Sequence, residues 1–216
     1  MKKNVTELVF IIDRSGSMHG LEGDTLGGFN SMLEKQKHTE GEAYVSTILF
    51  NDYSKVIHDR RNIMKVEPLT ATQYQVGGCT ALLDAIGGAI HHIGNVHKYA
   101  RTEDVPAKTL FVIITDGMEN ASHHYTADQI KEKIQRQKEQ YGWEFLFLGA
   151  NIDAVGVAGN IGIEEDRAVK YCCDAEGTQL NYEEVGKAVQ SLRAGRGIAK
   201  GWKKKIEADE AARGRS

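Results

Sequence analysis

The sequence predicts an α/β fold in which helices flank a doubly wound, mostly parallel sheet of six strands. Short runs rich in β-branched and aromatic residues alternate along the chain with stretches whose apolar residues recur every three or four positions. This alternation is typical of parallel strands that are joined by helices. Two of the runs, 8–12 and 109–114, are each followed closely by an aspartate. A chain of 216 residues is long enough to form one such domain.

The first half of the chain contains five predicted elements. An apolar run gives the first strand, and a helical stripe of large apolar residues follows it. A second strand comes next, with a hairpin or edge neighbour beside it, and a second helical stripe then begins after a pair of glycines. In chain order, these elements are 8–12, 26–33, 43–50, 53–58 and 82–93.

The second half continues the alternation with a strand over 108–115. Thr126 and Gln129 then match the capping box that opens a helix, because each side chain can bind the backbone N–H near the other residue. Two further strands are predicted at 143–148 and 167–172, before a closing helix over 181–192.

Three oxygen-bearing side chains follow the first strand at every second position: Asp13, Ser15 and Ser17. In an extended or turning segment, residues i, i+2 and i+4 share a face, so these oxygens can converge. Oxygen ligands favour magnesium, calcium or manganese over zinc. The same residue types are also common in a plain strand-to-helix turn, so this motif alone leaves both interpretations open.

Two later segments favour the metal interpretation. Thr80 stands at the start of the helix that follows Gly77 and Gly78, and Asp116 ends the second aspartate-terminated strand. Open sheets of this kind bind ligands beyond the carboxyl ends of their strands, where the strand order reverses. We therefore expect the strands that end at Asp13 and Asp116 to be neighbours.

Together these motifs resemble the metal-ion-dependent adhesion site, or MIDAS, of the von Willebrand factor A domain family, which has a Rossmann-like fold. The family pattern is Asp-x-Ser-x-Ser, then Thr, then Asp, and all five positions are present in order. The resemblance implies that Ser15, Ser17 and Thr80 touch the metal directly, whereas Asp13 and Asp116 often act through water. It also implies that one coordination position is left for an acidic residue of a partner protein.

The resemblance extends over residues 5–194, and segment 147–154 is similar to one in small stand-alone intracellular members from bacteria and phages. It implies a bound Mg²⁺, with Mn²⁺ or Ca²⁺ as alternatives. Intracellular members commonly act as adaptors in assemblies with AAA-type ATPases or stress-response proteins. We therefore expect a metal-dependent protein-binding module.

We expect no catalysis from this chain. The position two after Asp13 is Ser15, where a phosphatase of the haloacid dehalogenase type would carry a second aspartate. A Mg²⁺-dependent phosphatase or nuclease is the enzymatic alternative. A structural or assembly component, encoded by a phage and independent of metal, is the third interpretation.

The resemblance implies a von Willebrand A domain over residues 1–194, and the charge distribution separates a basic tail over 195–216 from it. The tail holds seven Lys or Arg against three Asp or Glu, whereas the rest of the chain holds 20 against 27. Ile198, Trp202 and Ile206 recur every four residues, so the tail can form a short amphipathic helix. Such a helix can pack on its own domain, a partner helix, nucleic acid or an anionic surface. We expect no nucleic-acid binding outside this tail.

Composition indicates a cytoplasmic chain. No stretch approaches the ~20 apolar residues that span a membrane, and the first residues lack a cleavage site for export. The three cysteines, Cys79, Cys172 and Cys173, are odd in number and two are adjacent, which fits neither a disulfide framework nor a zinc knuckle.

Other polar residues near the motifs have both functional and structural interpretations. His19, Glu119 and Asn120 follow the metal motifs, so they can lie on the rim of the site. Asp84 is one turn beyond Thr80, and a solvent-facing or capping role is the simpler expectation. Asp153 is a candidate helix cap.

Overall fold

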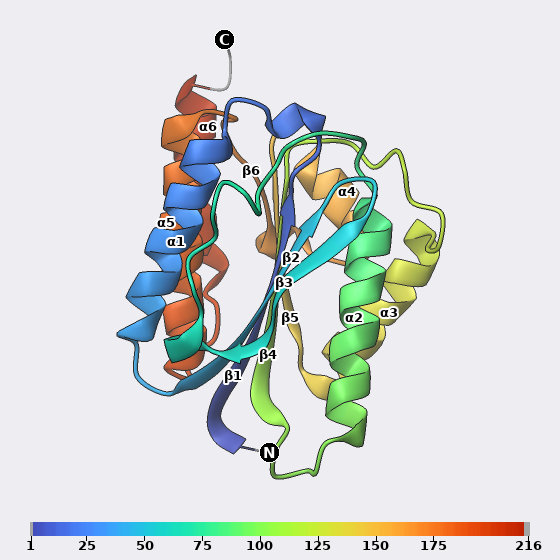
Figure 1. The fold of residues 1–216 in the computed structure, drawn as a ribbon, viewed down its shortest axis with the longest axis vertical. Coiled ribbons are helices and arrows are strands. Elements are labelled where there is room, and N and C mark those ends of the chain that lie inside the picture. The colour runs from blue at the N-terminus through green and yellow to red at the C-terminus, as the bar shows by residue number, and fades with distance from the viewer. Residues whose placement is uncertain (1, 214–216) are drawn as a thin grey trace.

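The computed structural model describes residues 2–213 and contains a six-stranded sheet between two layers of helices (Figure 1). The strand order is β3-β2-β1-β4-β5-β6, and only β3 runs antiparallel to its neighbour. The predicted α/β fold, with a mostly parallel sheet of six strands, is therefore confirmed. The strands are β1 Lys2–Asp13, β2 Glu42–Phe50, β3 Ser54–Asn62, β4 Pro106–Thr115, β5 Glu144–Gly149 and β6 Ala168–Lys170.

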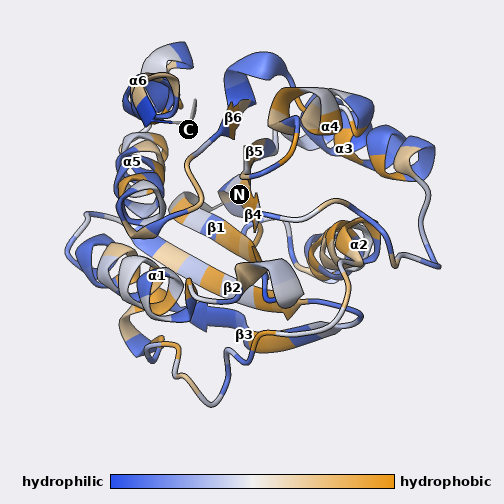
Figure 2. Cartoon of the chain, turned by 90° about the horizontal axis from the view of Figure 1, so that it is seen from above, coloured by the Kyte–Doolittle hydropathy of each residue, from blue (hydrophilic) through white to orange (hydrophobic). Residues whose placement is uncertain are grey.

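Helices cover both faces of the sheet (Figure 2). One layer consists of α1, α5 and α6, and the other consists of α2, α3 and α4. Short 3-10 turns occur at Gly16–Met18, Ile63–Lys65, Glu165–Arg167 and Lys200–Lys203. The helices are α1 Glu22–Lys37, α2 Leu82–Tyr99, α3 Ala127–Tyr141, α4 Ala154–Asn160, α5 Ala175–Arg193 and α6 Lys204–Arg213.

The first strand lies at the centre of the sheet and is buried on both faces. Its alternate residues Phe10 and Ile12 point into the core under α1 and α5, whereas Val9 and Ile11 point into the core under α2 and α3. On one side β1 pairs with β2, and on the other side it pairs with β4. The strands that precede Asp13 and Asp116 are therefore neighbours, as the sequence predicts.

Several elements, such as β1 and α1, extend beyond their predicted ranges, and three others differ more strongly. The capping role of Asp153 is confirmed, because its carboxylate accepts the Gly156 N–H at the start of α4. The extent of this helix was not predicted, since its seven residues include two glycines and carry no long apolar stripe. Helix α5 begins at Ala175 rather than 181, because Asp174 caps it and accepts the Gly177 N–H at 2.8 Å. Strand β6 has three residues instead of the six predicted over 167–172.

The chain after α5 packs on the domain in the described residues. Ile198, Trp202 and Ile206 are buried in the same core as α1 and α5. Residues 214–216, the end of the predicted tail, and Met1 lie outside the described residues. No helix within residues 2–213 has the length and apolar character to cross a membrane.

Candidate metal centre

The first loop of the candidate site begins where β1 ends, at the buried Asp13. The backbone N–H of Ser15 donates to Asp13 Oδ1 at 2.6 Å, which turns the chain sharply after the strand. A 3-10 turn over Gly16–Met18 then brings the two serine hydroxyls within 3.1 Å of each other. Ser15 is buried and Ser17 is exposed, so the loop leads from the core to the surface.

Two further hydroxyl groups donate hydrogen bonds to Asp13. Thr115 Oγ1 donates to Asp13 Oδ2 at 2.5 Å, and Tyr74 OH donates to the Asp13 carbonyl at 2.6 Å. Neither residue belongs to the sequence motif. The position of Thr115 directly before Asp116 could have indicated from the sequence that it lies near the site. Nothing in the sequence relates Tyr74 to β1.

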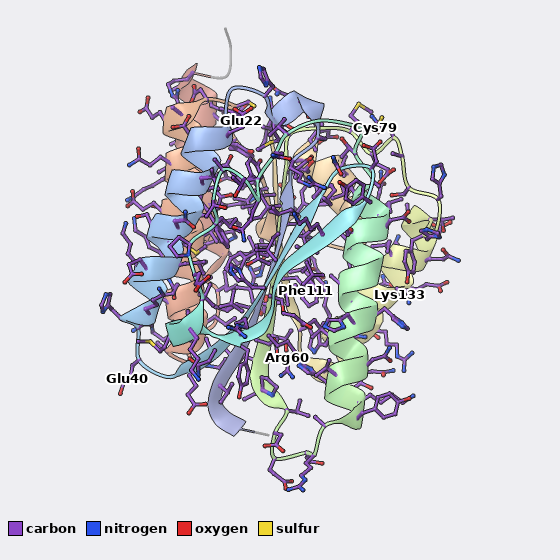
Figure 3. The ribbon with its side chains drawn as sticks, viewed as in Figure 1. Glu22, Glu40, Arg60, Cys79, Phe111 and Lys133 are labelled. Atoms are coloured by element: carbon purple, nitrogen blue, oxygen red, sulfur yellow. The ribbon has the colours of Figure 1, made fainter. Side chains whose placement is uncertain are left out.

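The second loop carries Thr80 to the same edge of the sheet. Gly78 has a φ of +80°, a backbone conformation that favours glycine, and the Asp52 carboxylate lies against its Cα. Asn120 fixes the loop at its other end: Asn120 Oδ1 accepts the Thr80 N–H at 2.9 Å, and the Asn120 N–H donates to the Thr80 carbonyl at 3.1 Å. Asn120 therefore holds Thr80 in place. In Figure 3, the labelled Cys79 lies at this upper edge, directly before Thr80.

The third loop brings Asp116 and Gly117 to the two serines and Thr80. Ser17 Oγ donates to Asp116 Oδ1 at 2.6 Å. A Cβ built on Gly117 would lie 2.9 Å from Thr80 Oγ1, 3.0 Å from Ser17 Oγ and 3.6 Å from Ser15 Oγ. The three hydroxyls of the first two loops thus converge on one point, which a side chain at position 117 of the third loop would fill.

The two carboxyl groups share a buried and electrostatically unfavourable environment. Burial raises the pKa of Asp13, hydrogen bonds from Thr115 and Ser15 lower it, and the nearby Asp116 raises it again. Burial likewise raises the pKa of Asp116, against the hydrogen bond from Ser17. A divalent cation beside both groups would favour their charged forms. Two carboxylates and three hydroxyls are oxygen donors of the kind that Mg²⁺ and Ca²⁺ prefer.

The structure brings together all five residues of the predicted set: Asp13, Ser15, Ser17, Thr80 and Asp116. The motif predicted this convergence because each residue lies on a loop at the carboxyl edge of the sheet or at the helix start beside it.

Two acidic residues near the site bind backbone groups instead. Glu119 accepts the N–H groups of Leu83, Ala121 and Ser122, at 2.8, 2.9 and 2.8 Å. Asp84 accepts three N–H groups of segment 123–125, each at 2.9 Å, so it fixes the loop before α3 and neither faces solvent nor caps a helix. Both carboxylates stabilise the start of α2 and the loop after β4.

Cys173 lies beside the site and was missed by the sequence interpretation. Its Sγ lies 3.8 Å from Asp116 Oδ2, the carboxylate oxygen that does not face Ser17. Burial and the negative charge of Asp116 raise the pKa of the Cys173 thiol to about 11. The adjacent positions of Cys172 and Cys173 in the sequence do not indicate that Cys173 lies beside Asp116.

Sequence comparison finds no matching family model and no matching curated protein. Solved structures do match. Proximal thread matrix protein 1 from the mussel byssus, solved with a zinc-occupied MIDAS motif, gives a TM-score of 0.60 at 16% identity over 87% of this chain and 46% of its own. A von Willebrand factor type A protein from Catenulispora acidiphila gives 0.56 at 14% identity over 88% of this chain and 43% of its own.

A third structure, the ArnB paralog VWA2 from Sulfolobus acidocaldarius, gives a TM-score of 0.55 at 14% identity over 84% of this chain and 45% of its own. The chain spans less than half the length of each of these three structures. At such low identity the likeness concerns the fold. The strand order, the two helix layers and these matches together show that this chain has the fold of a von Willebrand factor type A domain.

Proposed function

We propose that this chain is a protein-binding module whose site holds Mg²⁺ and accepts an acidic side chain of a partner protein. The observation that carries the proposal is the convergence of Ser15, Ser17 and Thr80 on the Gly117 position, beside the Asp116 carboxylate. Asp13 and Asp116 would offset only part of the charge of the cation, and Ser15, Ser17 and Thr80 would supply neutral oxygens. Mn²⁺ and Ca²⁺ have the same preference for oxygen and are alternative occupants.

The donor set favours an acidic partner. Neutral hydroxyls leave a divalent cation with much of its charge, so a carboxylate from outside gains a charge-assisted bond to it. The bound metal supplies this attraction, whereas the chain supplies the position: Ser17 lies on the exposed side of the site, where a partner has access.

The surroundings of the site support binding without catalysis. Hydrolysis of a phosphate ester with Mg²⁺ usually needs a positioned base or nucleophile as well as the ion. Three nearby carboxylates, those of Asp52, Glu119 and Asp84, each accept backbone N–H groups. Ser15 occupies the position two after Asp13, where a phosphatase of the haloacid dehalogenase type would carry a second aspartate.

Titration calorimetry with MgCl₂ tests the site directly. We expect the wild type to bind Mg²⁺, and we expect Asp116→Asn and Thr80→Val to lose most of the binding heat. Asp59→Asn is a matched control, since Asp59 is an exposed carboxylate on β3 that pairs with His92. Equal heats from the wild type and both site variants would remove the proposed site.

Three further measurements separate the alternatives. Capture of a partner from cell extract that is lost with EDTA, and equally lost with Asp116→Asn, would support the adaptor interpretation. Hydrolysis of p-nitrophenyl phosphate by the wild type that disappears with Asp13→Asn would instead show an enzyme. A thermal midpoint that responds to neither Mg²⁺ nor EDTA would favour a metal-independent structural component.

A further inference from the structure

The segment after α5 runs along the end of the sheet at β6. We call residues 198–213, which include α6, the strap. Ile198, Trp202 and Ile206 are the apolar residues that seat it on the core. It therefore packs against α5 and β6, in the helix layer that contains α1 and α5.

Strand β6 has little support of its own. It has three residues, it pairs only with β5, and it ends the described sheet. The strap binds carbonyl groups along this edge: Trp202 Nε1 donates to the Asp166 carbonyl at 2.9 Å, and Lys203 Nζ donates to the carbonyls of Glu165 and Ala168 at 2.7 and 2.8 Å. Lys203 is buried, so its side chain substitutes for part of a missing strand partner.

The far end of the strap holds the loop that follows β6. Arg213 Nη1 binds Asp174 Oδ2 at 2.6 Å, while Arg213 Nη2 binds Asp209 Oδ2 at 2.5 Å. The other oxygen of Asp174 caps α5. Lys170 and Glu210 form a second ion pair between β6 and α6 at 2.8 Å. The loop over 171–174 is thus fixed from α6 on one side and from α5 on the other.

This loop reaches the metal centre through Cys173. The residue directly precedes Asp174, and its Sγ lies 3.8 Å from Asp116 Oδ2. Figure 1 shows the described end of α6 at the same upper end of the molecule as the loop that follows β1. A short series of contacts therefore leads from Arg213 through Asp174 and Cys173 to Asp116.

We propose that the strap positions the Asp116 side of the metal centre by fixing the loop over 171–174, so that its release weakens Mg²⁺ binding. This inference rests on the proposed function. Arg213 and Lys203 are positioning residues: neither reaches the metal, and both act through the loop that places Cys173 against Asp116.

Reactivity of the Cys173 thiol reports on the loop independently of any metal. In a Cys79→Ser, Cys172→Ser background, only Cys173 can react with N-ethylmaleimide. We expect Arg213→Ala to raise the rate of this reaction about fivefold, the scale on which a partly exposed ion pair acts. Arg213→Lys should give an intermediate rate because it keeps the charge. Arg136→Ala, on the opposite helix layer, is the matched control and should leave the rate unchanged.

The same variants are then titrated with MgCl₂. Arg213→Ala and Lys203→Met should weaken Mg²⁺ binding about threefold to fivefold, whereas Arg136→Ala should not. Circular dichroism and the urea midpoint show whether each variant remains folded. Arg213→Ala preserves the apolar seat of the strap, so it provides the test if Lys203→Met does not fold.

The outcomes separate the two proposals. Unchanged Cys173 reactivity in Arg213→Ala would overturn the proposal that the strap fixes the loop over 171–174. Raised reactivity with unchanged Mg²⁺ affinity would overturn its link to the metal centre. A wild type that binds no Mg²⁺ would overturn the proposed function and this link with it, while the reactivity data would still decide whether the strap fixes the loop.

Discussion

Gly117 sets how closely the hydroxyls of the metal centre approach one another. A Cβ at this position would lie 2.9 Å from Thr80 Oγ1 and 3.0 Å from Ser17 Oγ, closer than ordinary contact. We expect Gly117→Ala to spread these oxygens and to weaken Mg²⁺ binding about tenfold, equivalent to about 1.4 kcal/mol. Titration calorimetry measures the change. Gly88→Ala is the control: Gly88 lies within α2 with nothing within 4 Å of its Cβ position, so that variant should gain about 0.5–1 kcal/mol of stability and keep its Mg²⁺ affinity.

The raised pKa of Asp116 predicts how the metal-free protein responds to pH. Burial raises this pKa above that of the unfolded chain, so the charged group destabilises the fold at pH values above its folded pKa. As the pH falls through the folded pKa, the carboxyl group takes up a proton and this penalty disappears. In EDTA, we therefore expect Asp116→Asn to be more stable than the wild type at pH 8 and the difference to shrink as the pH approaches the ordinary carboxyl range. Urea unfolding at several pH values measures it, and a difference independent of pH would contradict the argument.

At the scale of residues, the sequence predicted the groups that spacing and strand ends bring together. Asp13 and Asp116 follow buried strands, so their convergence could be read from the apolar runs before them. Tyr74 and Cys173 could not be predicted, because each reaches the site from an irregular segment whose path depends on the packed fold. Spacing rules act within an element, whereas these contacts join segments distant in sequence.

A buried charged cluster joins three elements at the end of the sheet away from the metal centre. Glu7 of β1 is completely buried, and its Oε2 accepts from Arg60 Nε and Nη2 of β3, each at 2.9 Å, and lies 3.3 Å from His97 Nε2 of α2. Figure 3 labels Arg60 near the lower part of the sheet, far from Cys79. Removing Arg60 leaves a buried carboxylate without its main partner, so we expect Arg60→Met to cost about 3–5 kcal/mol in urea unfolding.

A second variant distinguishes the ion pair from simple packing. Glu7→Met combined with Arg60→Met removes both charges and should recover most of the lost stability. Glu34→Gln is the surface control: it breaks the pair of the exposed Glu34 with Lys37 on α1 and should change stability by less than about 1 kcal/mol. A double variant as unstable as Arg60→Met would show that the methylene packing of these side chains matters more than their charges.

At the scale of elements, the sequence predicted those helices and strands whose formation depends mainly on local composition. The capping box of Thr126 and Gln129 is present at the start of α3, with both of its hydrogen bonds. The extent of helix α4 escaped prediction because tertiary contacts, rather than helix propensity, stabilise its glycine-containing segment. The short β6 shows the opposite effect: of the residues predicted as a strand, only three pair with β5, while Lys203 of the strap binds the carbonyls of Glu165 and Ala168.

At the scale of the whole molecule, alternating strands and helices were enough to predict the sheet and its two helix layers. They also predicted that β1 and β4 are neighbours, because two strands that end at one site must lie side by side. The amphipathic pattern of Ile198, Trp202 and Ile206 predicted a buried face but not what it packs against. An apolar stripe specifies that a surface is covered, whereas the covering element depends on the geometry of the complete fold.

Because the metal centre joins three separate loops, a bound cation should stabilise the molecule as a unit. Residues 13–17, 80 and 116 lie at the ends of β1, α2 and β4, so a ligand held by all three binds only the folded chain. At a Mg²⁺ concentration 100 times the dissociation constant, linkage gives about 2.7 kcal/mol, which corresponds to a rise of about 5–10 °C in the thermal midpoint. Scanning calorimetry with MgCl₂ against NaCl of equal ionic strength measures it. Asp116→Asn should remove the rise, and an equal rise in that variant would place the stabilising cation elsewhere on the chain.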